Sequence, residues 1–173
     1  MPNNYRIFFK KLNDSDLNAF SLPVNPENIK ESTDSDNEEY NVLSIGPVMQ
    51  PRKPKLRIVS FSSYFPGQAD SLTLDPEAYR SPGYYINFFK SAMQNKEIIT
   101  YIPSRRYETG EAYALELGSG FDAMVTSFAY EEKGGETGDF YYDLELTEYK
   151  NFSPLKMTLT GASGEQGENG NGA

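Results

Sequence analysis

Apolar and polar residues alternate most regularly near the end of the chain, where residues 140–149 read FYYDLELTEY. Successive side chains of a β-strand point to opposite faces, so every second residue shares a face. The apolar face carries Phe140, Tyr142, Leu144 and Leu146. The opposite face carries Tyr141, Asp143, Glu145, Thr147 and Tyr149. We expect the first face to pack in a core and the second, which is acidic and aromatic, to lie at the surface.

Similar runs of β-forming residues, bounded by Gly, Pro, Asn and Asp, predict the other strands. The expected strands are residues 5–12, 40–49, 56–65, 97–102, 112–117, 121–130 and 140–149. The strand at 40–49 is expected to end at Gly46-Pro47, and the last three strands are expected to form a meander. Residues 30–39, KESTDSDNEE, are polar and acidic and predict a mobile loop.

One helix is predicted between the third and fourth of these strands. Ser81 stands at the N-cap position and Pro82 at the first helical position, which suit both residue types. Tyr85, Phe89 and Met93 follow at helical spacing and predict a buried stripe. The predicted fold is therefore α+β, predominantly antiparallel β and barrel- or sandwich-like, with one main helix.

The length and the distribution of residue types predict one domain followed by a tail. A chain of 173 residues suits one domain with a genuine core. We expect this β-rich domain to span residues 1–152. Residues 153–173 are expected to be disordered, because the Gly-rich and acidic stretch GASGEQGENGNGA at its end has almost no apolar side chain to bury.

The composition excludes several classes of chemistry. The chain has no Cys and no His, which rules out disulfides, thiolate metal sites, cysteine nucleophiles and histidine-dependent triads. Its formal net charge of −9 disfavours a nucleic-acid partner. No stretch approaches the roughly 20 apolar residues of a membrane helix. The first residues lack a signal-peptide core, so we expect no membrane association and synthesis in the cytoplasm.

Asp143 and Glu145 are the strongest catalytic candidates. Standing two residues apart on one strand face, they are roughly 6–7 Å apart, near the about 5–5.5 Å between the carboxyl groups of a retaining glycosidase. Any two acids on a solvated strand have the same spacing, and the sequence supplies neither a cleft nor a third catalytic group. We therefore predict no catalytic residue and no enzymatic activity.

Two other kinds of sequence motif resemble ligand-binding sites. On closer comparison neither fits, so we predict no cofactor and no metal. GSGFDA, residues 118–123, has the letters of a dinucleotide fingerprint, but the residues after it alternate as a strand. Because that fingerprint needs a following helix, we interpret the segment as a hairpin turn. The acidic runs from Asp14 and from Asp34 lack the sixth-position Gly and twelfth-position Glu of a calcium loop.

The aromatic content favours a protein interface. The chain contains 13 Tyr and 11 Phe, and Tyr joins a large contact area to a polar tip. The predicted interface residues on the acidic face are Tyr141, Asp143, Glu145 and Tyr149. The basic candidates for a complementary surface are Arg52, Lys53 and Lys55 in the connector QPRKPK, with Arg105 and Arg106.

Three stretches, in order, resemble one protein family. They are FSLPVNPENI (20–29), YNVLSIGPV with KLRIVSFSSYFPG (within 40–67), and VTSFAYEEKGGETGDFYYDLELTEYK (125–150). Together they are similar to the LysM-type baseplate and tail proteins of contractile phage tails and phage-derived contractile particles. In that family an LP-x-x-P segment precedes a strand ending in Gly. Next come a strand ending in aromatic residues and Pro, here Tyr64-Phe65-Pro66, an aromatic helix, and a late strand with Gly-Asp, an aromatic pair and alternating Leu.

The resemblance covers about residues 5–152 and implies a tail-tube-like structural part without catalysis. Such proteins lie in the baseplate, where tail tube, hub and sheath meet, and the expected partners are tube, hub and sheath-initiator proteins. They usually occur as rings, so a homohexamer is expected. The implied location is a virion or phage-like particle assembled in the bacterial host cytoplasm. After Phe152 the family commonly continues into a LysM domain, whereas this sequence runs into a Gly-, Glu- and Asn-rich tail, so no glycan-binding role of that domain is carried over.

Two other function classes stay open. A carbohydrate-binding β-module also combines strands with exposed aromatic and acidic residues, and it predicts saccharide binding by a monomer. A carboxylate-only glycoside hydrolase would require Asp143 and Glu145 in a cleft. Co-purification with a large particle would separate the structural role from both.

Overall fold

The computed structural model describes residues 5–105 and 120–152, which form a seven-stranded antiparallel sheet, one α-helix and a separate two-stranded hairpin. The elements are β1 (Tyr5–Lys11), a 3-10 turn (Asp16–Asn18), β2 (Phe20–Ser21), β3 (Ile29–Ser32), β4 (Glu38–Val42), β5 (Gly46–Gln50), β6 (Ile58–Phe65), α1 (Pro82–Asn95), β7 (Ile99–Arg105), β8 (Phe121–Glu132) and β9 (Phe140–Glu148). The strand order in the sheet is β2-β1-β7-β8-β9-β6-β3. This confirms the predicted α+β class, with an open sheet among the described strands.

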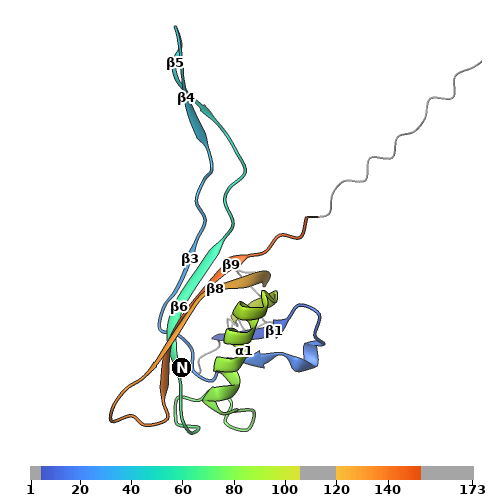
Figure 1. Ribbon diagram of the computed structural model, residues 1–173, viewed down its shortest axis with the longest axis vertical. Helices are drawn as coiled ribbons and strands as arrows, with labels where there is room; N and C mark the ends of the chain where they lie inside the picture. The colour runs from blue at the N-terminus through green and yellow to red at the C-terminus, as the bar shows by residue number, and fades with distance from the viewer. Residues whose placement is uncertain (1–4, 106–119, 153–173) are drawn as a thin grey trace, which may run out of the picture.

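Helix α1 covers one face of the twisted sheet (Figure 1). Tyr85 and Phe89 are buried as predicted, and the Phe89 ring meets the Phe9 ring of β1 edge-on at 5.0 Å. The prediction for Met93 is wrong, since its side chain is 37% exposed. With 3.6 residues per turn the buried stripe moves to Ala92, which lies closer to the face set by Tyr85 and Phe89.

The start of α1 is where the sequence predicts it. Ser81 occupies the N-cap position and Pro82 the first helical position. The Ser81 carbonyl accepts a hydrogen bond from the Tyr84 N–H at 2.9 Å, but the Ser81 side chain makes no capping bond. Proline at this position needs no hydrogen-bond partner for its nitrogen, so the helix begins here without a side-chain cap.

The apolar face of β9 is part of the core, as predicted. Tyr142, Leu144 and Leu146 are buried there, and Phe140 packs at the margin. The Tyr142 ring stacks on Phe65 of β6 with the centroids 4.1 Å apart. Since β9 lies between β8 and β6 in the sheet, its opposite face is a central part of the sheet surface.

Residues 33–57 form an arm that leaves the sheet between β3 and β6 (Figure 1). At its end β4 pairs with β5 around a turn at residues 43–45. Ser44 in this turn (φ 78°) and Gly46 at the start of β5 (φ 92°) have left-handed backbone conformations. The prediction of a single strand at 40–49 is therefore wrong, because this turn reverses the chain within the apolar run. The predicted loop at 30–39 is also partly wrong, since β3 and the start of β4 occupy its two ends.

Several predictions lie outside the described residues. These are the strand at 112–117, the first two residues of the GSGFDA segment, Arg106 and the tail at 153–173. The end of GSGFDA, from Phe121, begins β8, so a strand follows its glycines as expected. β7 extends to Arg105, beyond the predicted end at residue 102. Among the described helices, none has the length and apolar character needed to cross a membrane.

Candidate assembly interface

A groove of about 920 Å³ runs beside the acidic face of β9, and its lining includes Tyr141, Asp143 and Glu145. β3 pairs only with residues 58–61 of β6, so the second half of β6 has no further strand beyond it among the described residues. The segment before β3 contains Pro23 and Pro26, which lack an N–H and cannot continue a ladder. The structure thus places a groove beside Asp143 and Glu145 that the sequence alone does not reveal.

Hydroxyl groups hold the two central carboxylates of the groove. Ser62 lies directly opposite Asp143 in the β6–β9 register and donates a short hydrogen bond to its Oδ1. The Thr126 hydroxyl donates to Glu145 Oε1 at 3.0 Å. Thr126 reaches Glu145 because the β8–β9 register shifts between Val125 and Ser127. These hydrogen bonds hold both carboxylates in place at the surface, where they can accept further hydrogen bonds.

Two stacked tyrosines stand at one end of the groove. The Tyr64 and Tyr141 rings lie 5.5 Å apart, and the Lys133 ammonium lies 3.5 Å from the centroid of the Tyr141 ring. Burial, followed by the hydrogen bond to Asp70, raises the pKa of Tyr64 to about 12. The hydrogen bond to Glu136 raises the pKa of Tyr141. Both hydroxyls therefore stay protonated at neutral pH and act as donors.

The walls of the groove combine apolar and acidic side chains. They come from the segment before β3, which supplies Val24 and Glu27, and from the loop after β6, which supplies Leu72 and Leu74. The Leu74 N–H donates to the Pro23 carbonyl at 2.8 Å, which joins the two segments. Leu72 is 62% exposed, so apolar surface is open to a partner beside the carboxylates.

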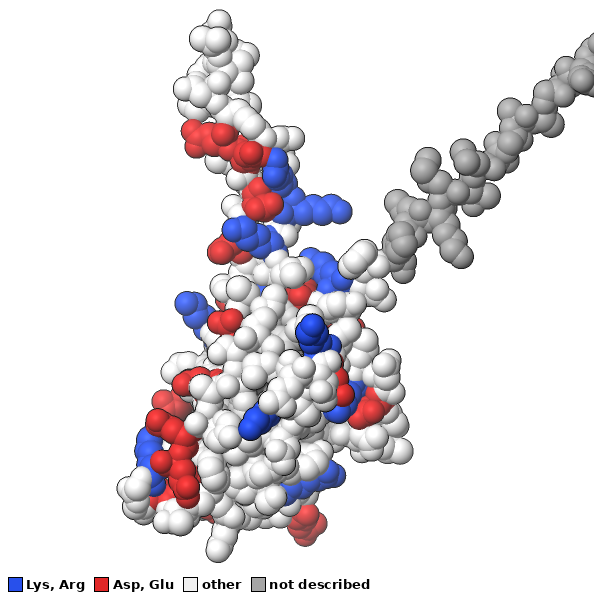
Figure 2. Space-filling view, viewed as in Figure 1, with Lys and Arg blue, Asp and Glu red and all other residues white. Residues whose placement is uncertain are grey.

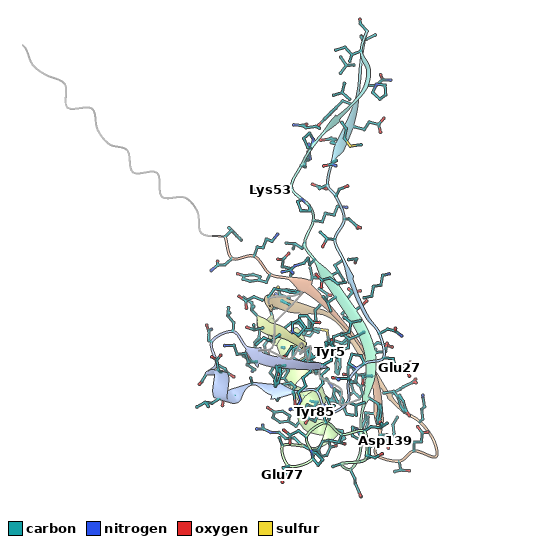
Figure 3. The ribbon with its side chains drawn as sticks, turned by 180° about the vertical axis from the view of Figure 1, so that it is seen from behind. Tyr5, Glu27, Lys53, Glu77, Tyr85 and Asp139 are labelled. Carbon is teal, nitrogen blue, oxygen red and sulfur yellow. The ribbon has the colours of Figure 1, made fainter. Side chains whose placement is uncertain are left out.

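Of the basic residues predicted as a complementary surface, Arg52, Lys53 and Lys55 lie on the arm and do not line this groove. Arg52 forms an ion pair with Glu38 inside the arm. Lys53 and Lys55 are exposed on the arm. Figure 3 shows Lys53 away from the sheet and the helix. Arg105 ends β7, three strands from β6 in the sheet.

Tyr149, one of the four interface residues predicted on the acidic face, does not line the groove. It follows the end of β9, and its backbone N–H donates to the Asp122 carbonyl at 2.6 Å. Tyr141, Asp143 and Glu145 line the groove, and the interface role of all four residues stays a prediction.

The sequence analysis missed the apolar end of the arm. No charged residue occurs between Tyr40 and Gln50, and Figure 2 shows the end of the arm uncharged above a band of acidic and basic side chains. Leu43 is 94% exposed, Ile45 75% and Met49 61%. We define residues 40–50 as the arm tip. The signal that could have revealed it is the small, turn-forming Ser-Ile-Gly sequence in the middle of an apolar run.

The sequence analysis also missed part of the groove. Tyr64 and Glu27 belong to its lining. Tyr64 shares a strand face with Ser60 and Ser62, and that polar alternation is visible in the sequence. Glu27 precedes β3 in an irregular segment, where no periodicity assigns a face. Within residues 5–105 and 120–152, no group of three acidic side chains is placed to hold a metal ion.

Comparison with known proteins gives one sequence relative and several structures. No protein-family model matches the sequence. Uncharacterized protein YqbP of Bacillus subtilis (strain 168) is 30% identical to this chain over 136 residues, which are 79% of this chain and 57% of that protein. The chain thus spans little more than half the length of this relative.

The similar solved structures belong to tail-like particles. The tail of an empty GTA particle with C6 symmetry has a TM-score of 0.49 at 13% identity, covering 87% of this chain and 94% of that chain. The anti-feeding prophage baseplate gives 0.46 at 8%, covering 87% and 91%. The tube-terminating cap of the same particle gives 0.45 at 11%, covering 86% and 85%. With TM-scores below 0.5, we draw no functional conclusion from these structures.

Proposed function

We propose that this chain is a structural, non-enzymatic part of a contractile tail or injection particle. It lies in the baseplate, where tail tube, hub and sheath meet, and it assembles as a six-fold ring with tube, hub and sheath-initiator proteins as neighbours. The particle assembles in the bacterial host cytoplasm. The arm is the observation on which this proposal rests.

The arm is costly for a free monomer. Its tip exposes Leu43, Ile45 and Met49, and burying one such side chain completely is worth about 1.5–3 kcal/mol. A two-stranded hairpin without a core is also marginally stable in water. A second molecule that covers the tip removes both costs. An element that becomes stable on contact is expected in an assembly subunit.

The groove and the arm coincide with the segments that resemble baseplate proteins. Residues 20–29 contribute a wall of the groove, residues 40–67 contain the arm tip and β6, and residues 125–150 contain β8 and β9. The resemblance is thus concentrated in the two surfaces that a partner would contact. This overlap supports the baseplate location and the absence of catalysis.

Saccharide binding is the second candidate, because the groove contains tyrosine and carboxylate side chains. A sugar would need a free aromatic face to stack on. Tyr141 already stacks on Tyr64 and carries Lys133 over its ring. This arrangement favours the structural role over the carbohydrate-binding module.

Particles from the producing bacterium test the proposal. After sedimentation of the particles, we expect an affinity-tagged copy of the chain among their proteins, and cryo-electron microscopy should place six copies in the baseplate. A variant with Tyr141→Ala and Glu145→Lys should fold normally but be missing from particles, because it loses an aromatic contact and reverses a charge. Particles that contain tube and sheath proteins but lack the wild-type chain would refute the assignment.

Purified protein tests the two rival functions. When the protein is mixed with oligosaccharides, we expect no shift in their electrophoretic mobility and no heat of binding in calorimetry. We also expect no glycoside hydrolysis. A hydrolase activity that disappears in Glu145→Gln would overturn the non-enzymatic role.

A further inference from the structure

The groove contains carboxylates that lack a cationic partner among the described residues. Asp143 and Glu145 accept hydrogen bonds from hydroxyl groups, but neither forms an ion pair there. Glu27, a third carboxylate in the lining, forms no ion pair in that part of the chain either. Lys30 is the lysine among the lining residues. The groove therefore presents more negative than positive charge to an incoming molecule.

The arm carries lysines that lack an anionic partner among the described residues. Lys53 and Lys55 are exposed, and neither side chain forms an ion pair among the described residues. The flanking arginines differ, because Arg52 and Arg57 are both paired with glutamates of the same chain. Two ammonium groups are therefore free for a contact outside the chain.

The shape of the arm segment fits a groove beside a strand. Pro51 and Pro54 favour an extended chain and leave two nitrogens without a hydrogen to donate. In an extended chain, Lys53 and Lys55 are roughly 6–7 Å apart, which is also the spacing of Asp143 and Glu145 on β9. The arm points away from the sheet and helix of its own chain. Figure 3 shows Lys53 on the arm, far from Glu27. A contact between these charges therefore needs two molecules.

We infer that residues 51–56 of one copy lie in the groove of a second copy, with Lys53 and Lys55 against Asp143 and Glu145. This inference rests on the proposed ring and identifies its contact. Each chain carries both surfaces at different places, so the contact is head-to-tail and can close into a ring. The Pro side chains and the 41% exposed Leu56 supply apolar contact for the groove wall. A second copy is the favoured occupant because both complementary surfaces are on this chain.

Charge reversal tests the contact in solution. Lys53→Glu with Lys55→Glu, and separately Asp143→Lys with Glu145→Lys, should each weaken self-association by roughly tenfold or more, as measured by sedimentation velocity at low salt. The variant with all four changes should regain it, because the charges are complementary again. The matched control, Lys90→Glu with Glu77→Lys, alters two exposed charges elsewhere and should associate like the wild type.

Engineered cysteines give a second readout that does not depend on affinity. The chain has no Cys, so Lys55→Cys with Asp143→Cys creates the sole thiols. Oxidation of the wild-type-like assembly should give a ladder of covalent multimers, whereas either single variant should give no more than dimers. If the double-cysteine variant stays monomeric after oxidation, the inferred contact is wrong. The same holds if the wild type sediments only as a monomer.

The outcomes also separate this inference from the proposed function. If the chain is present as a baseplate ring but the reversed charges have no effect on association, the contact is wrong and the function stands. If the four-fold reversal fails to restore association while each pair abolishes it, both surfaces serve self-association but do not contact each other, and the inferred contact is wrong. If the contact forms but particles lack the chain, the proposed function fails.

Discussion

Leu144 and Leu43 allow a matched test of which leucines stabilise the fold and which serve assembly. Leu144 is 2% exposed and lies opposite Phe61 on β6 and Phe128 on β8. Strands on both sides prevent collapse of the cavity that Leu144→Ala leaves, so we expect a loss of about 3 kcal/mol in the free energy of unfolding. For a chain of this size that corresponds to a decrease of about 6–12 °C in Tm.

The same substitution at the arm tip should behave in the opposite way. Leu43 is 94% exposed, so Leu43→Ala should change the free energy of unfolding by less than about 0.5 kcal/mol. It removes a contact from the proposed assembly surface, so particles should incorporate this variant less than the wild type. Thermal unfolding followed by circular dichroism measures the first quantity, and quantitative blotting of sedimented particles measures the second. A stable Leu144→Ala, or a strongly destabilised Leu43→Ala, would refute this division.

Further substitutions test the packing and the charges of the head. Gly67→Ala should destabilise the protein, because its Cβ would lie 2.9 Å from the Gly138 carbonyl carbon, while Gly134→Ala has open space and should be neutral in urea unfolding. Burial alone raises the pKa of Glu148, but hydrogen bonds from Arg57 and its charge lower it below 4.5. Stability from Glu148 should therefore be present above pH 4.5 and be lost as the pH falls through the folded-state pKa, and Glu148→Gln should flatten this decrease.

The sequence predicts the core strands well because burial on one face leaves a periodic record. The alternation in β9 fixed which residues are buried, and the Ser81-Pro82 pair located the start of α1. The strands of the arm show no alternation of apolar and polar residues, because both of their faces are exposed. An apolar run without a core is indistinguishable by pattern from a buried strand, so 40–49 was predicted as one strand.

The groove illustrates a second limit of sequence patterns. Periodicity placed Asp143 and Glu145 on the outer face of β9, and the structure agrees. The groove beside them arises because β3 ends its pairing at Phe61 and irregular segments bring Glu27 and Leu72 alongside. Contacts between segments that are distant in the sequence depend on the three-dimensional path of the chain. The local alternation of apolar and polar residues carries no information about that path.

The attachment of the arm has a mechanical consequence. Its two segments continue directly into β3 and β6, so a pull along the arm acts along the strands of the sheet (Figure 1). Hydrogen bonds of an antiparallel ladder lie perpendicular to the strands. The pull therefore shears the β6–β9 ladder and loads all of its pairs, from Ile58 with Thr147 to Phe65 with Phe140, at the same time. A hairpin pulled apart at its open end would lose its bonds one after another, whereas this arm transmits tension into the whole sheet.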